Sequence, residues 1–162
     1  MGIAVMSWMF AIPLLGFVTG LRSMTAMAVL CWFAFHGDLP VDGTWAFWAA
    51  KRITMIVFIV LAAGELIGDK LPMIPNRTDA LPLIARIFFG GLIGAICATS
   101  LGGRYIEAVF LGVIGAVAGA FLGFHCRQWL TRKIGAPDVF VAVAEDIFAV
   151  GASILAMRIV TG

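Results

Sequence analysis

Six apolar runs follow one another along the chain and constrain its fold more than any other feature. They cover residues 3–20, 23–36, 53–68, 83–101, 106–126 and 139–160, close to the roughly 20 residues of a membrane-spanning helix. Apolar residues make up 62% of the sequence, and a soluble domain of this size could not hide so much apolar surface from water. The runs predict an all-α, polytopic transmembrane bundle of five to six short helices, forming one membrane domain over residues 1–162.

The stretch Thr19-Gly20-Leu21-Arg22-Ser23 leaves two span counts open. A glycine and a charged residue disfavour a continuous helix facing lipid at this point, but they suit a tight hairpin or a break that faces protein. With a hairpin, residues 3–36 form two spans and the total is six. With one broken or re-entrant element, the total is five.

Composition also limits the partners. The net charge of +2, without a run of Lys and Arg, argues against nucleic acid as a partner. The three cysteines show no CxxC or Cys/His spacing, so we expect neither a metal nor another cofactor. Signatures such as HExxH and GxSxG are absent, and no catalytic residue is assigned. The expected partners are the lipid bilayer, a small solute or ion, and a second copy of the chain in a homodimer.

An internal repeat predicts a symmetric layout. Gly20-Leu21-Arg22-Ser23 corresponds to Gly102-Gly103-Arg104-Tyr105, and two later matches follow in order at a nearly constant offset: Lys51-Arg52 with Arg132-Lys133, and Gly64-Glu65 with Ala144-Glu145. Three spans in each half, about 3–75 and 83–161, would place the halves in opposite orientation. This inverted three-plus-three layout is typical of transporters.

Charged residues beside or within the apolar runs are the candidate site, because ionisable groups are costly at membrane depth. Glu65 can be a proton carrier or cation ligand, or a carboxylate solvated at a helix end. Asp69 lies four residues later on the same helical face, and Lys70 is a possible ion partner. The adjacent acids Glu145 and Asp146 point about 100° apart on a helix, so they should face different neighbours.

Arg22 and Arg104 occupy the equivalent breaks of the two halves, with Ser23 beside the first. An arginine beside free amides at a new helix start can bind an anion. It can equally pair with a carboxylate or reach the lipid phosphates. We expect Arg22 to be paired inside the protein, with Glu65, Asp69, Glu145 and Asp146 as candidate partners.

At Gly20-Leu21-Arg22-Ser23, residues 64–72 and Ala144-Glu145-Asp146, the chain resembles a family of small bacterial integral membrane proteins known only as a domain of unknown function. The resemblance implies that these polar motifs belong together in a compact bundle of the bacterial inner (cytoplasmic) membrane. It implies no activity.

The expected function is a small transporter or channel-like carrier of a solute or ion, coupled to protons or cations through its glutamates. A membrane enzyme acting on lipid-linked or headgroup substrates would instead use the polar stretch from Asp69 to Asp79. A structural or accessory subunit would use the glycine stripes at residues 90–94 and 112–123 against a partner.

Overall fold

The computed structural model describes residues 2–68 and 79–162, with side chains from residue 8 onward. Every regular element of these residues is helical, which confirms the all-α prediction. The elements are α1 (Gly2–Leu21), α2 (Thr25–His36), the 3-10 helix η1 (Phe47–Ala50), α3 (Arg52–Gly68), α4 (Ala80–Leu101), α5 (Tyr105–Arg132) and α6 (Asp138–Thr161).

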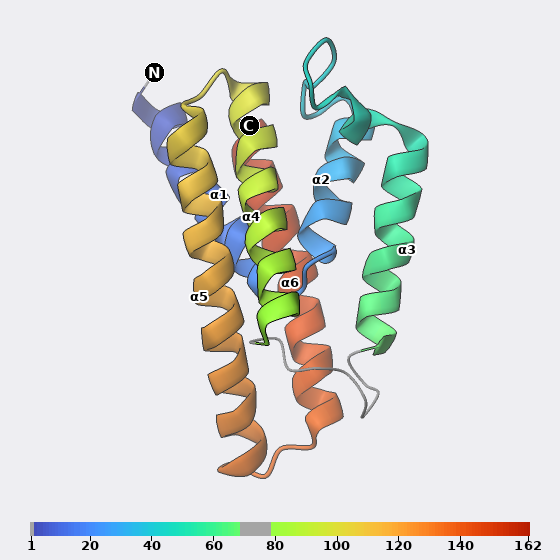
Figure 1. Ribbon diagram of the computed structural model, residues 1–162, viewed down its shortest axis with the longest axis vertical. Helices are drawn as coiled ribbons and strands as arrows, with labels where there is room; N and C mark the ends of the chain where they lie inside the picture. Colours follow the sequence, from blue (N-terminus) through green and yellow to red (C-terminus); the bar gives the residue numbers. More distant parts are fainter. Residues whose placement is uncertain (1, 69–78) are drawn as a thin grey trace.

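Successive α-helices run in alternating directions, so both ends of the chain lie at the same end of the bundle (Figure 1). Helices α1, α4 and α5 pack against one another, and α6 joins this group through α1. Helix α2 connects α6 to α3, which is the outermost helix on that side. The fold therefore consists of a tightly packed group of three helices, with the other three arranged around it.

Helices α1 and α2 form a hairpin whose tip lies inside the bundle (Figure 1). Helix α2 has 12 residues, a length of about 18 Å, and the hydrocarbon core of a bilayer is about 30 Å thick. It begins part-way along the bundle and returns to the end from which α1 started. Residues 3–36 therefore form two helices separated at Arg22, Ser23 and Met24, and the chain is broken at the predicted position.

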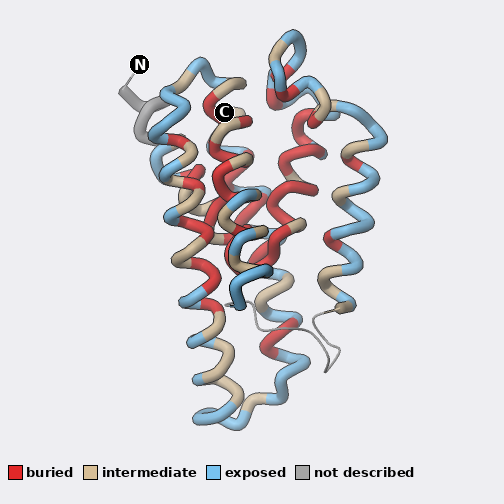
Figure 2. Tube along the Cα trace, viewed as in Figure 1, coloured by how far each residue is buried: buried red, intermediate tan, exposed pale blue. Residues whose placement is uncertain are grey.

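The outer surface of the described residues is largely apolar. Helices α4, α5 and α6 are each long and apolar enough to cross a membrane. Large apolar side chains are widely exposed, among them Ile53 (78%), Leu81 (83%) and Ile106 (74%). Figure 2 shows buried residues gathered at the centre of the bundle, whereas α3 is exposed over most of its length. A large exposed apolar surface of this kind marks contact with a membrane or with another protein, and the three long apolar helices favour a membrane.

Helix α5 extends past the predicted run, which ends at residue 126, and continues to Arg132. Residues 127–132 contain two arginines, a glutamine and a threonine, so the predicted apolar run ends before them. Arg, Gln and Leu are nevertheless good helix formers, and nothing breaks the helix before Gly135, which has a φ of 72°. The α5–α6 hairpin consequently projects beyond the other helices at this end (Figure 1).

Glycines allow α5 to lie unusually close to both α1 and α4. A Cβ atom added at Gly119 would overlap the backbone of Phe17, and one added at Gly112 would overlap the backbone of Gly90. Gly115 faces the Pro13 carbonyl in the same way. The glycine stripe is therefore used for packing inside the chain, as small residues are in many membrane helices.

Replacing Gly119 by alanine should lower the melting temperature in detergent, because overpacking costs about 1–3 kcal/mol. The matched control is Gly151→Ala on α6, where an added Cβ meets no atom within 4 Å. Alanine favours helix over glycine by about 1 kcal/mol, so the control should be neutral or stabilising. Equal melting temperatures for the two variants would contradict close packing of α1 on α5.

Candidate functional site

The break between α1 and α2 lies inside the bundle, beside the apolar helix α5. Gly20, just before it, packs against the α5 backbone at Ala116, Gly119 and Ala120. From Ala120 to Arg127 the helix rises about 10 Å, at 1.5 Å per residue. The turn is buried among the helices, so its polar groups need partners from the protein.

Arg22 is buried at this break and paired with Asp146 of α6. Its side chain is 1% exposed, and its Nη2 atom lies 2.6 Å from Asp146 Oδ1. This confirms the expectation that Arg22 is paired inside the protein and identifies one of its four candidate partners. A buried guanidinium is tolerable here because a carboxylate offsets its charge.

Glu65 of α3 binds the backbone at the same break. The amide of Ser23 donates to Glu65 Oε1 at 2.8 Å, and the amide of Met24 donates to Oε2 at 2.9 Å. These amides lie at the start of α2, where the first N–H groups of a helix have no acceptor within the helix. Glu65 therefore caps α2 from a different helix, and its negative charge suits the positive end of the helix dipole.

Arg86 of α4 completes the cluster and was absent from the residues predicted from sequence. Its Nη1 donates to the Gly20 carbonyl at 3.0 Å, and its Nη2 lies 4.0 Å from Glu65 Oε1. It is 7% exposed. A usable signal existed, because Arg86 is the single charged residue of the apolar run 83–101. Arg22 was predicted on similar grounds, because it is a charged residue between two apolar runs.

Four charged side chains thus converge on one helix break, and we call Arg22, Glu65, Arg86 and Asp146 the charge cluster. They come from the α1–α2 turn, α3, α4 and α6. Two guanidinium groups face two carboxylates, so the cluster is neutral when both acids are ionised. It combines positive charge, two backbone donors and a carboxylate that engages those donors.

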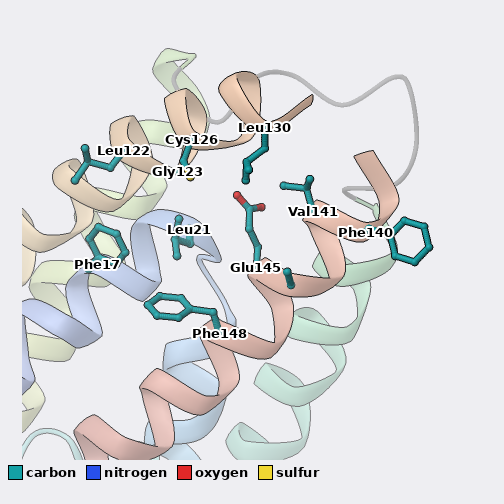
Figure 3. A pocket seen from close by; sticks show the side chains of 11 residues that line it. Phe17, Leu21, Leu122, Gly123, Cys126, Leu130, Phe140, Val141, Glu145 and Phe148 are labelled. Carbon is teal, nitrogen blue, oxygen red and sulfur yellow. The ribbon is translucent and has the colours of Figure 1, made fainter. Parts of the chain in front are cut away.

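Glu145 faces a different partner from Asp146, as the helical geometry predicts. Its Oε2 lies 3.7 Å from Nη1 of Arg127 on α5, and Arg127 also binds both carboxylate oxygens of Asp138 at 2.8 and 2.7 Å. Figure 3 shows the Glu145 carboxylate pointing toward Leu130 of α5. The structure therefore does not bring Glu145 together with Glu65.

The structure also keeps Arg104 away from the cluster. Arg104 is 81% exposed and pairs with Glu107 on its own helix, at 2.7 Å. Ser23 takes part through its backbone amide. Asp69 and Lys70, together with most of the polar stretch up to Asp79, lie outside the described residues.

The sequence matches the profile of a family described as a domain of unknown function (DUF4126), over residues 9–159. The chain belongs to this family. The matched residues include every member of the charge cluster. Comparisons with curated proteins and with solved structures found no match.

Substituting Arg22 by alanine should lower the stability of the folded protein by about 3–5 kcal/mol, because it leaves the Asp146 carboxylate inside the bundle without its guanidinium. Arg22→Ala combined with Asp146→Ala should recover part of this loss, measured as melting temperature in detergent. Arg104→Ala, which removes an exposed pair, should change stability by less than about 1 kcal/mol. Equal effects of Arg22→Ala and Arg104→Ala would argue that Arg22 reaches the lipid headgroups.

Proposed function

We propose that this protein is a small membrane carrier of a solute or ion, with a pathway that passes the charge cluster and Glu65 as the coupling group. One observation carries the proposal: the Glu65 carboxylate accepts hydrogen bonds from the two backbone amides at the break between α1 and α2. Ionisable groups at membrane depth mark ion and substrate pathways in membrane proteins. Broken helices whose N-terminal ends face an anionic group are a feature of transporter sites.

The contacts of Glu65 suggest how transport would be coupled to protons. When Glu65 is protonated, its hold on the amides of Ser23 and Met24 weakens, and the cluster changes from neutral to a net charge of +1. Arg22, Arg86 and the start of α2 would then favour a small anion in place of the Glu65 carboxylate. A proton and a monovalent anion would bind together, so that the loaded cluster is neutral again.

A further polar group lies beside this position. Thr25, the first residue of α2, is 3% exposed, and its hydroxyl has no hydrogen-bond partner among the described residues. Buried hydroxyl groups are usually hydrogen-bonded. Thr25 is therefore a candidate contact for the solute, next to the amides that Glu65 occupies.

The proposal keeps the inverted repeat and the homodimer as its working architecture. The alternating helix directions are compatible with two halves of opposite orientation (Figure 1). The packing of the halves differs, because α5 contacts α4 extensively whereas its counterpart α2 makes few contacts with α1. A superposition of α1–α3 on α4–α6 with opposite membrane orientation is what the repeat requires. A bundle of six helices encloses little volume, which is the reason for expecting a dimer.

Glu65→Gln should abolish the pH dependence of transport, whereas Glu107→Gln should leave it nearly intact. Glu107 is the matched control because it is an acid on a spanning helix that pairs with an exposed arginine. The measurement uses proteoliposomes with an entrapped pH dye and imposed gradients of nitrate, chloride or phosphate. A parallel gradient of potassium gluconate tests for cation transport.

Anion-driven proton uptake that disappears in Glu65→Gln is the expected result. Flux with potassium alone would assign Glu65 to a cation instead of an anion. Equal, small effects of the two substitutions would make both carboxylates structural and would contradict the proposed coupling role.

A further inference from the structure

An apolar cavity opens between α5 and α6, at the end of the bundle where their hairpin projects. It has a volume of about 690 Å³ and lies between the end of α1 and the two helices. Figure 3 shows its walls, which are apolar apart from the Glu145 carboxylate and the Cys126 thiol. The apolar lining includes Phe17, Leu21, Leu122, Leu130, Val141 and Phe148.

A second hollow, of about 540 Å³, lies on the neighbouring face of α5 and has a different character. It shares Leu122 and Cys126 with the cavity, so these two residues form the ridge between them. Its other lining residues are polar, basic or aromatic: His125, Gln128, Trp129, Arg132 and Lys133. One side of α5 thus offers an apolar space next to a basic, partly aromatic one.

The positions of these two spaces along α5 correspond to the acyl chains and the headgroup of a phospholipid. The apolar run of α5 ends at residue 126, so the cavity lies mainly beside membrane-spanning residues. Trp129 is 51% exposed just beyond it, and tryptophan concentrates at the headgroup level of bilayers. Arg132 and Lys133 follow within one turn and are exposed. In a bilayer the cavity would therefore face the acyl chains, and the basic pair would face the phosphates.

We infer that this surface binds an anionic phospholipid, with an acyl chain in the α5–α6 cavity and the phosphate beside Arg132 and Lys133. Basic pockets next to spanning helices attract anionic headgroups. Charge complementarity favours an anionic lipid over a zwitterionic one, because the headgroup level of α5 carries adjacent positive charges. This inference does not depend on the proposed carrier activity.

Binding can be measured by native mass spectrometry of the full-length protein in detergent, titrated with phosphatidylglycerol or phosphatidylcholine of identical acyl chains. Phosphatidylglycerol should bind more tightly. Arg132→Gln with Lys133→Gln should weaken its binding by roughly tenfold or more. The matched control is Lys51→Gln with Arg52→Gln, which removes the exposed basic pair at the opposite end of the bundle. Equal affinity for the two lipids, or equal loss in both double variants, would overturn the headgroup assignment.

The chain part of the site is tested by filling the cavity. Ala144 lines it, and Ala144→Phe should reduce phosphatidylglycerol binding without lowering the melting temperature. Val150→Phe is the control, because Val150 is exposed on the same helix and does not line the cavity. Unchanged lipid binding in Ala144→Phe would show that the acyl chain lies elsewhere and would overturn the inference.

Discussion

A backbone amide buried away from water must find an acceptor, and the break between α1 and α2 leaves two such amides without one in their own helix. Glu65 satisfies both, from a helix that lies far away in sequence. The arrangement brings a negative charge into the bundle, and that charge in turn needs positive neighbours. Arg86 lies on one side of the carboxylate, and Arg22, paired with Asp146, occupies the same turn. The charge cluster thus follows from the broken helix: the two amides need Glu65, and the charge of Glu65 needs positive neighbours.

The position of the break depends on how closely helices can approach. Glycines on α5 remove the side chains that would hold α1 and α4 away, and Gly20 itself lies against the α5 backbone. If these positions carried larger side chains, the backbones of α1 and α5 could not touch. The tip of the hairpin would then lie farther from α5. Dense packing around the break also keeps the charges at fixed distances.

The neighbouring acids Glu145 and Asp146 of α6 contact two different parts of the bundle. Asp146 turns inward to Arg22 and belongs to the charge cluster. Glu145 turns toward α5, where Arg127 lies between it and Asp138 at the membrane end. The first contact stabilises the centre of the bundle. The second ties α5 to α6 beside the cavity that we assign to lipid, so the two regions meet on α6 without sharing a residue.

The sequence by itself indicated the all-α class and the apolar segments that form the helices, because apolar runs and glycine breaks act locally. It also singled out Arg22, Glu65 and Asp146, since a charge within or beside an apolar run is costly wherever the helix lies. Only the tertiary structure decided that Arg22 pairs with Asp146, that Arg86 joins the cluster and that Arg104 stays exposed. Those outcomes depend on the depth and rotation of each helix relative to its neighbours. Packing between helices sets both the depth and the rotation, and the order of residues along the chain does not specify either of them.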